Sequence, residues 1–394
     1  MIGASYGDEG KGRTVDWLAA SSGPKALVVR SNGGAQAGHT VETPKGRRHV
    51  FHHVGSGTFR GARTHLSRYM VSHPILFAEE VTALSRHLDL PAISADPRGF
   101  VTTPFDMMVN QAAELARDGA RHGSCGLGFG ETVGRCETGP YALTVADLYR
   151  PGLKDRLIAI REEWLPKRLE EMDLRPGFGP LAFASSRDLL DCFVAQCTEF
   201  ARRVGRRDDP QIGEEDTVIF EAAQGLLLDQ NASGFPFVTR SKTGLANISA
   251  IAAEAGIESL DAIFASRCYL TRHGRGPMED ERPIKQWYAL EDPTNQPNPW
   301  QETMRHGLID PAKLADRIAL DLARSTVPCR ASLAMTCLDQ AKKRFVWLSE
   351  GEPREGTEAA FLGAMGRATG LPLTVCFSSP RNEWHRDAIR TSSF

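Results

Sequence analysis

Long apolar runs are absent from the 394-residue sequence, since none reaches the roughly 18 residues that a membrane-spanning helix needs. The first residues include Asp8, Glu9 and Lys11, where a signal peptide would need an apolar stretch. A surplus of one charge is also absent, because 47 Lys and Arg residues stand against 49 Asp and Glu residues. These absences predict a protein that is neither secreted nor membrane-bound and that has no general attraction for nucleic acid.

Cysteine pairs with a functional spacing are missing as well. The eight cysteines are scattered along the chain, and none forms a Cys-x-x-Cys pair of the kind found in zinc or redox sites. Unpaired cysteines without a disulfide framework are typical of a reducing compartment. We therefore expect free thiols and a cytoplasmic location.

What the sequence does contain is an alternation of apolar, β-rich runs with longer segments of helical spacing. The predicted strands are Ala26–Arg30, Val218–Ala222, Ala262–Leu270, Leu333–Cys337, Phe345–Leu348 and Leu371–Phe377. The predicted helices are Pro74–Arg86, Phe105–Asp118, Lys154–Glu171, Arg187–Val204, Pro311–Arg324 and Glu358–Thr369. This alternation predicts the α/β class, with a mostly parallel central sheet flanked by helices.

Two stretches have the composition of long loops. His122–Gly139 carries six glycines, and Glu291–Gly307 is rich in proline and asparagine. Long loops inside a compact domain usually close over ligands, which is what we expect of both. The alternative is that they are disordered excursions from the surface.

The first turn of the chain has the composition of a phosphate cradle. The segment "ASYGDEGKGRTVDWLAA" predicts a strand over Met1–Ser5, a turn over Tyr6–Gly12 and a helix over Arg13–Ala20. Backbone N–H groups in such a turn and the helix N-terminus favour a phosphate, and Lys11 adds a full cation. The segment is only P-loop-like, because Gly12 stands where a P-loop has the Ser or Thr that binds Mg²⁺. Asp8 is the expected replacement ligand, although an ordinary tight turn is the alternative.

A second polar cluster follows the predicted strand Ala26–Arg30. The stretch "SNGGAQAGHTV" places His39 near the carboxyl end of that strand, where α/β proteins bind ligands. The alternative is a solvent-exposed loop histidine without a catalytic role.

Together, "YGDEGKGR" and "AGHTV" resemble the adenylosuccinate synthetase family. Further stretches agree in the same order, namely "HHVGSGTF", "FEAAQGLLLD" with "GFPFVT", "TRHGRGP", "RHGLID" and "MTCLD". The resemblance implies a single domain over residues 1–394 that couples L-aspartate to the 6-oxo carbon of IMP, with GTP and Mg²⁺, as a homodimer. The partners it implies are small molecules and neither nucleic acid nor membrane.

The resemblance also implies roles for individual residues. Asp8 resembles the catalytic base and a Mg²⁺ ligand, with the Gly38 carbonyl completing the metal site, and His39 resembles the acid that stabilises phosphate. Lys11 would hold phosphates. The residues expected to contact nucleotide are Gly7, Glu9, Gly10, Gly12, Gly38, Thr40, Cys125, Arg135, Gln224, Thr239 and Asp339.

More specific contacts follow from the same resemblance. Gln224 would contact the purine base and Thr239 the acceptor's phosphate. Arg135 is the candidate for an arginine that reaches that phosphate from the other subunit. Arg305, with Thr303 beside it, would bind the carboxylates of aspartate. Asp339 would accept hydrogen bonds from guanine.

Several positions depart from the family pattern. Cys125 and Leu127 stand where many members have Thr and Arg, Gln36 replaces an asparagine, Cys337 replaces a lysine, and only Met1–Ser5 precede the first turn. One alternative is therefore the phage-type succino-aminoadenylate synthetases, which act on (d)GMP with ATP or dATP, although Asp8 argues against it. Others are a nucleotide-binding regulator without turnover and a generic P-loop hydrolase.

Overall fold

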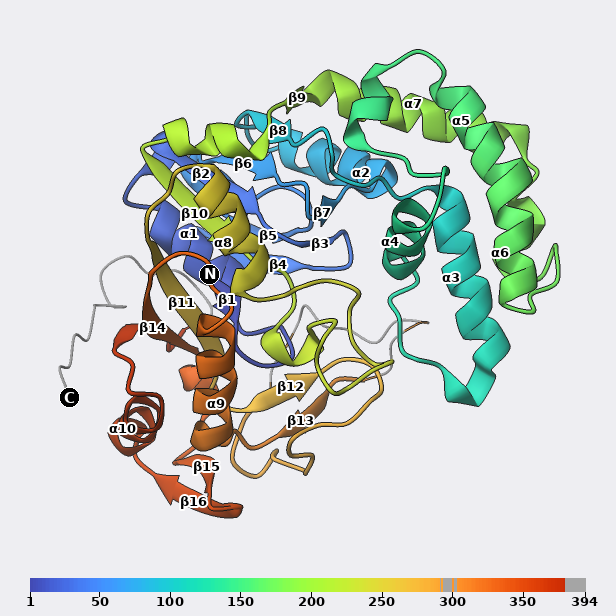
Figure 1. Cartoon of the computed structure of the whole chain (residues 1–394). Helices are drawn as coiled ribbons and strands as arrows, with labels where there is room; N and C mark the ends of the chain where they lie inside the picture. The colour runs from blue at the N-terminus through green and yellow to red at the C-terminus, as the bar shows by residue number, and fades with distance from the viewer. Residues whose placement is uncertain (291, 293–299, 301–302, 380–394) are drawn as a thin grey trace.

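The computed structural model is built around a central parallel sheet, with a group of helices beside it (Figure 1). The structure describes residues 1–290, 292, 300 and 303–379. Four strands lie in the order β1-β11-β14-β17 and five in the order β10-β2-β6-β8-β9. The two sets meet at β1, because the Met1 amine donates to the Phe220 carbonyl at 2.8 Å and the Ala222 N–H donates to the Met1 carbonyl at 3.1 Å.

The strands of this sheet have two to eight residues, and their neighbours in the chain are mostly helices. They are β1 (Ile2–Gly3), β2 (Ala26–Arg30), β6 (Arg63–Leu66), β8 (Ile93–Ala95), β9 (Val204–Arg206), β10 (Thr217–Glu221), β11 (Leu260–Arg267), β14 (Cys329–Thr336) and β17 (Leu373–Cys376). The remaining strands form small pairs: β3 (Gly33–Gly34) with β7 (Met70–Val71), β4 (His39–Glu42) with β5 (Arg48–Phe51), β12 (Leu270–Arg272) with β13 (Arg305–Gly307), and β15 (Phe345–Ser349) with β16 (Glu352–Gly356).

The helices form layers around this sheet. They are α1 (Lys11–Ala19), α2 (Pro74–Ser85), α3 (Pro104–Arg117), α4 (Phe129–Glu137), α5 (Leu153–Ala159), α6 (Leu165–Glu171), α7 (Arg187–Arg203), α8 (Leu245–Glu254), α9 (Pro311–Leu322) and α10 (Glu358–Thr369). Helices α3 to α7 build a separate layer on one side, and α9, α10 and the β15–β16 hairpin lie on the other (Figure 1). None of the helices within the described residues is long and apolar enough to cross a membrane.

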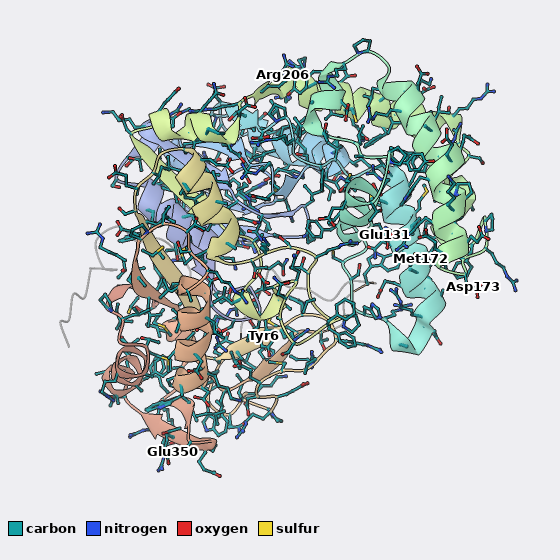
Figure 2. The ribbon with its side chains drawn as sticks, in the orientation of Figure 1. Tyr6, Glu131, Met172, Asp173, Arg206 and Glu350 are labelled. Carbon is teal, nitrogen blue, oxygen red and sulfur yellow. The ribbon has the colours of Figure 1, made fainter. Side chains whose placement is uncertain are left out.

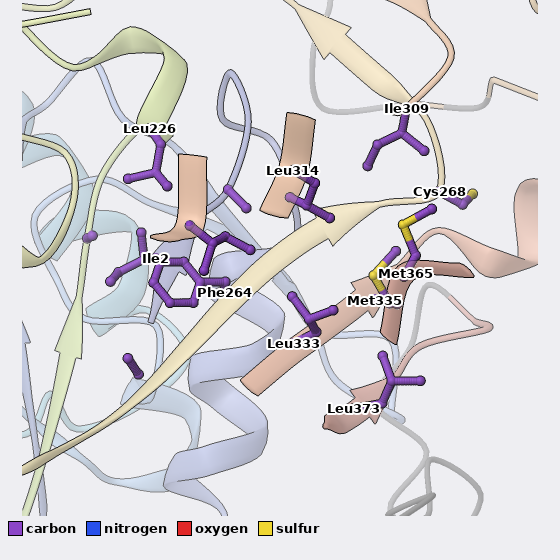
Figure 3. Close-up of a cluster of buried hydrophobic side chains, with 14 of the residues drawn as sticks. Ile2, Leu226, Phe264, Cys268, Ile309, Leu314, Leu333, Met335, Met365 and Leu373 are labelled. Atoms are coloured by element: carbon purple, nitrogen blue, oxygen red, sulfur yellow. The ribbon is translucent and has the colours of Figure 1, made fainter. Parts of the chain in front are cut away.

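The parallel strands are held by side chains that are buried on both faces of the sheet, as is usual when helices cover both sides. In β2 all five residues are buried. The largest buried cluster gathers Ile2, Phe264, Leu333 and Met335 from neighbouring strands (Figure 3). This packing fixes the positions of the strand ends, and therefore the positions of the turns that follow them.

The α/β class with a mostly parallel central sheet is confirmed, and the predicted helices are present within one or two residues of their expected bounds, with one interruption. The predicted helix Lys154–Glu171 is interrupted by a π-helical turn over Ile160–Trp164. Pro166 is the second residue of the next helix, α6. Because proline has no N–H to donate to the ordinary helical hydrogen bond, the helix is locally wider before it.

The prediction of an uninterrupted loop over His122–Gly139 is wrong. Helix α4 occupies Phe129–Glu137, because the side chains of Thr132, Val133 and Cys136 are buried against the neighbouring layer. Packing therefore overrides the low helix propensity of Gly130 and Gly134. The other predicted loop lies mostly outside the described residues, and its last three residues form β13. All eight cysteines are free thiols, as expected.

The backbone of the first turn touches the segment after β10. A Cβ atom on Gly225 would overlap the Ser5 carbonyl oxygen and lie 2.6 Å from the Gly7 nitrogen. We therefore expect Gly225→Ala to lower the free energy of unfolding by about 1–3 kcal/mol, because two backbones must separate. Urea titration measures this change. Gly119→Ala is the matched control, since a Cβ atom there meets nothing within 4 Å, and equal effects of the two variants would contradict the expectation.

His73, before α2, makes the folded state sensitive to acid. Burial, and then the nearby His53, lower the pKa of His73 to about 3 from an ordinary value of 6.5. Between these values the unfolded chain binds the extra proton, so the free energy of unfolding falls as the pH falls from 6.5 toward 3. We expect His73→Gln to show a shallower decline than the wild type in urea titrations between about pH 7 and about pH 5. Parallel declines would show that His73 does not cause the sensitivity.

Candidate functional site

The turn between β1 and α1 is built around the Glu9 carboxylate. One oxygen of Glu9 accepts hydrogen bonds from the Ser5 and Gly7 N–H groups at 2.9 and 2.8 Å. The other oxygen pairs with the Lys11 ammonium at 3.0 Å, and both side chains are buried. Glu9 therefore braces the turn, although we expected it to contact nucleotide, and it partly neutralises Lys11 before any ligand arrives.

Left-handed backbone at the turn shapes the cradle. Gly7 and Gly10 have φ of 97° and 76°, and Asp8 itself has φ of 61°. This conformation is unusual for a residue with a side chain. The Arg267 guanidinium donates to the Asp8 carbonyl and so helps to hold it. Helix α1 begins at Lys11, which leaves the first N–H groups of the helix facing the turn.

The two clusters identified in the sequence come together in one cavity of about 110 Å³. Gly10, Gly12 and Lys11 from the turn face Gly38, His39 and Thr40 from the start of β4. The full lining is Asp8, Glu9, Gly10, Lys11, Gly12, Gly38, His39, Thr40, Arg267 and Asp292. The cavity lies beyond the carboxyl ends of β1, β2 and β11, where ligands bind in open parallel sheets.

His39 sits on the inner wall of this cavity and is held by a buried network. Its Nδ1 atom lies 2.6 Å from Glu221 Oε1 and 2.9 Å from an Arg30 nitrogen. Burial first, and then the Arg30 charge, lower the pKa of His39 to about 4, so the imidazole is neutral near pH 7. The alternative of an exposed loop histidine is thereby excluded. Sequence reasoning missed Glu221 and Arg30, although Glu221 lies in the quoted "FEAAQG" stretch.

The donor chemistry at Asp8 suits Mg²⁺. The Asp8 side chain is 25% exposed and faces the cavity, and the backbone of Gly38 is exposed beside it. Within the described residues, no group of three His, Cys, Asp or Glu side chains could hold a metal alone. One carboxylate and one carbonyl, completed by phosphate and water oxygens, are the kind of ligand set that Mg²⁺ takes.

A larger cavity of about 290 Å³ lies between the sheet and the helical layer, and α4 contributes to its wall. Figure 2 shows Tyr6 on the sheet side and Glu131, from α4, on the helical side. Of the predicted residues, Cys125, Gln224 and Thr239 line this cavity. Its other charged and imidazole side chains are Glu114, Arg117, His122, Glu131, Arg240, Arg272, His273 and Arg275.

His273 links the two cavities and was not singled out from the sequence. Its Nε2 atom lies 3.8 Å from the Asp8 carboxylate, and it lines the larger cavity. Both ring nitrogens are buried and have no hydrogen-bond partner among the described residues. An unpartnered imidazole between an acidic side chain and an open cavity is available to a ligand. The only signal in the sequence was its place in "TRHGRGP".

The prediction that Arg135 reaches a phosphate in the other subunit is wrong for this structure. Arg135 is buried, and its guanidinium donates to both oxygens of Asp106 at 2.8 Å and to the carbonyls of Val101 and Tyr141. A guanidinium occupied in this way holds α4 against α3. The sequence could not reveal this, because an arginine in a glycine-rich stretch reads as exposed.

The predicted aspartate-binding residues lie outside both cavities. Arg305, on β13, pairs with Glu281 at 2.6 Å and donates to the carbonyls of Gly274 and Gly276. Thr303 is exposed, and so is Asp339, which follows β14. Arg305 is in register with Arg272, which lines the larger cavity. Arg305 therefore lies next to the larger cavity but does not line it.

A glycine-lined turn with a lysine beyond the carboxyl ends of parallel strands, next to a second polar cavity, is typical of nucleotide-binding α/β proteins. Fold and site place the chain in that class. The chain belongs more narrowly to the adenylosuccinate synthetase family, since the family's sequence pattern matches residues 1–296. The adenylosuccinate synthetase of Desulforapulum autotrophicum is 32% identical over 289 residues, which are 71% of this chain and 64% of that protein. The adenylosuccinate synthetase of Synechococcus sp. RCC307 is 31% identical over 291 residues, which are 71% of this chain and 63% of that protein.

The match thus spans slightly under two thirds of the length of these curated relatives. Among solved structures, fully ligated adenylosuccinate synthetase from Plasmodium falciparum has a TM-score of 0.74 at 17% identity and covers 96% of this chain and 97% of its own. A second solved structure is cyanophage S-2L succinoaminodeoxyadenylate synthetase bound to dGMP and dATP as an energy donor. It has a TM-score of 0.59 at 15% identity and covers 96% of this chain and 92% of its own. These two likenesses support the fold.

The buried pair of Arg135 and Asp106 gives a test of the assignment of Arg135 to packing. We expect Arg135→Met to lower the free energy of unfolding by about 3–5 kcal/mol, because Asp106 loses its buried counterion. Arg240→Ala is the matched control, since its pair with Glu137 is at the surface and is worth at most about 1 kcal/mol. Urea titration compares the variants. A variant at position 135 as stable as the control would restore a ligand-binding role.

Proposed function

We propose that the protein is a purine nucleotide ligase that joins L-aspartate to the 6-oxo carbon of a purine nucleotide at the expense of a nucleoside triphosphate. The observation that carries the proposal is the convergence of Asp8, Lys11 and His39 on one small cavity, beside a second, larger cavity with charged side chains at its wall. A carboxylate inside a phosphate cradle is otherwise unfavourable, because it repels the phosphate that the cradle binds. It becomes useful where the acceptor must be deprotonated at the point of phosphoryl transfer.

The chemistry needs both steps in one place. The 6-oxo carbon of the purine is a poor electrophile until its oxygen is made a leaving group. Asp8 takes the N1 proton, so that O6 attacks the γ-phosphorus and the bond to the β-phosphate oxygen breaks. The amine of aspartate then attacks C6 of the 6-phosphoryl intermediate, and inorganic phosphate leaves. Phosphoryl transfer of this kind depends on alignment and charge stabilisation, for which Lys11 and His39 are placed.

The other predicted residues complete the proposal. Asp8 and the Gly38 carbonyl would hold Mg²⁺, which neutralises phosphate charge when bound. The larger cavity would take the acceptor, with Gln224, Thr239 and Cys125 at its wall. Arg305 and Thr303 would bind aspartate once Arg305 leaves Glu281, and Asp339 would contact the donor base. The partners are then small molecules, with a second copy of the chain as a homodimer.

IMP as acceptor and GTP as donor are our first choice, because Asp8 is present. A phage-type acceptor, GMP or dGMP with ATP or dATP, is the other nucleotide pairing, and binding without turnover is the alternative from another class. The deciding assay supplies aspartate with IMP, GMP or dGMP and with GTP, ATP or dATP. It measures phosphate release and the product in which the aspartate nitrogen is bonded to C6 of the purine.

Asp8→Asn tests the proposed role of Asp8. The amide keeps the size of the side chain but cannot take the N1 proton, so we expect kcat to fall on the order of 10²–10⁴-fold. Glu42→Gln, on the same hairpin as His39, is the matched control and should retain activity. Unchanged turnover in Asp8→Asn would overturn the mechanism. Phosphate release that does not need aspartate would instead indicate a hydrolase, and nucleotide binding without any release a regulator.

A further inference from the structure

Several arginines line the larger cavity, and most of them are occupied within the protein. Arg117 pairs at 2.7 Å with Glu114, whose side chain is fully buried. If Arg117 turned to a ligand, a bare carboxylate would remain inside the protein, which is costly. Arg272 donates to two backbone carbonyls at 2.6 Å, and Arg275 donates to a third. These three arginines are therefore held by the protein itself.

Arg240 also lines this cavity, and its partner is easily exchanged. The guanidinium lies 3.2 Å from the carboxylate of Glu137, the last residue of α4. The two side chains are 47% and 52% exposed. A surface pair of this kind contributes little to stability, because water can solvate either partner. The guanidinium can therefore leave Glu137 for a ligand at a small cost in free energy.

The backbone around Arg240 is fixed, so only its side chain has to move. The Thr239 N–H and the Ser241 carbonyl, on either side of it, are hydrogen-bonded to residues 228–230 at 2.9 and 3.0 Å. The guanidinium itself lies over Gly134 of α4, where a Cβ atom would come within 2.8 Å of one of its nitrogens. The missing side chain at Gly134 thus leaves room for Arg240 against the helix.

The carboxylates of the cavity do not cancel the charge of Arg240. Glu114 is neutralised by Arg117, and Glu131 of α4 accepts two hydrogen bonds from Arg168 at 2.8 and 3.1 Å. Arg168 does not line the cavity, so its charge is used to neutralise Glu131 from outside. The wall formed by α4 and Arg240 therefore favours an anion.

Two neutral donors line the same cavity near α4. Gln36 lies beside Phe129, the first residue of α4, since a Cβ atom on Gly34 would meet both side chains. The Nε2 atom of Gln36 is buried and has no hydrogen-bond partner among the described residues. The hydroxyl group of Thr239 is the second donor. An amide, a hydroxyl and a guanidinium together suit phosphate, because its oxygens accept hydrogen bonds from all three.

The base of an acceptor nucleotide belongs at the other side of the cavity. His273 lines the cavity and lies 3.8 Å from the carboxylate of Asp8, which takes the N1 proton in the proposed function. Asp8 belongs to the first turn, on the sheet side, whereas Arg240 touches α4 on the helical side. A nucleotide whose base meets Asp8 therefore directs its sugar and phosphate toward the helical side.

We propose that Arg240 binds the 5′-phosphate of the acceptor nucleotide, in the same subunit whose Asp8 meets the base. The guanidinium exchanges the Glu137 carboxylate for two phosphate oxygens, which its planar fork can bind together. The identity of the ligand as an acceptor nucleotide rests on the proposed function. Arg240 thus supplies from the same chain the arginine that Arg135 does not supply, because Arg135 is held by Asp106.

The direct test is calorimetry of the full-length protein without a donor nucleotide. It compares IMP with inosine, which lacks the phosphate, and GMP with guanosine. We expect Arg240→Gln to weaken binding of the nucleotide on the order of 10–100-fold and to leave binding of the nucleoside unchanged, because one charge-assisted contact is lost. Unchanged affinity for the nucleotide, or an equal loss for the nucleoside, would overturn the proposal.

Two control variants separate binding from a merely structural role. Arg344→Gln removes an arginine from a similar surface pair, with Glu355 at 3.4 Å, that lines neither the small nor the larger cavity, and it should bind like the wild type. Glu137→Gln removes the partner of Arg240 and frees its guanidinium, so it should bind the nucleotide as tightly as the wild type or more tightly. Similar losses in Glu137→Gln and Arg240→Gln would show that the pair only supports α4.

Mixed subunits test whether Arg240 serves its own chain. Asp8→Asn and Arg240→Gln are combined in equal amounts and assayed at an acceptor concentration below the KM of the second variant. If Arg240 acts within its own subunit, the mixture should give only the summed rates of the two variants. A rate well above that sum would show that Arg240 reaches the site of a neighbouring subunit.

Turnover separates this proposal from the proposed function. In an active protein, Arg240→Gln should raise KM for the acceptor by the same factor as the loss of binding, with little change in kcat. An active protein whose acceptor KM does not depend on Arg240 would overturn the role of Arg240 and leave the ligase standing. A protein without turnover that still needs Arg240 to bind the nucleotide would overturn the ligase and leave the phosphate site standing.

Discussion

The position of β1 between β10 and β11 is the constraint on which the site depends. Its pairing on both sides makes the first turn leave the sheet at the same edge as the segments after Glu221 and Arg267. Gly3 and Gly225 allow this closeness, because a side chain at either position would overlap the turn or its neighbours. The small cavity thus combines residues from the first turn, from the start of β4 and from the end of β11, and no single segment could form it.

Charge pairing inside the protein is the second organising feature. Glu9 with Lys11, and Glu221 with Arg30, are buried opposite-charge pairs on either side of the cavity. Each buried charge avoids a large desolvation cost only because its partner is fixed. The cavity consequently offers a ligand less net positive charge than Lys11 and Arg267 suggest, while Asp8 adds a negative one. A phosphate there therefore gains from a divalent cation, which agrees with the oxygen donors at Asp8 and Gly38.

Local signals and tertiary packing contributed differently to what could be predicted. The first turn and the His39 cluster were identified because glycine, lysine and histidine lay in short patterns with a direct physical reading. Helix α4 was missed because its glycines argue against a helix, whereas its buried side chains and its ion pairs with α3 and α6 stabilise it. The predicted role of Arg135 was wrong for a similar reason, since the sequence does not show that its guanidinium donates to both oxygens of Asp106. His273 and Glu221 lay in recognised stretches, but their importance comes from distances to residues far along the chain.

The sequence by itself determined the α/β class, the family and the residues at the two ends of the cradle, because hydrophobic periodicity and short motifs are local properties. Only the tertiary structure decided which charges face a ligand and which face each other. The side chains of Arg135 and Glu9 are buried and pair with Asp106 and Lys11. Glu221 contacts His39, which lies 182 positions away in the sequence. The reason is physical: the burial and pairing of a charge depend on every element packed around it, and these contacts exist only after the chain has folded.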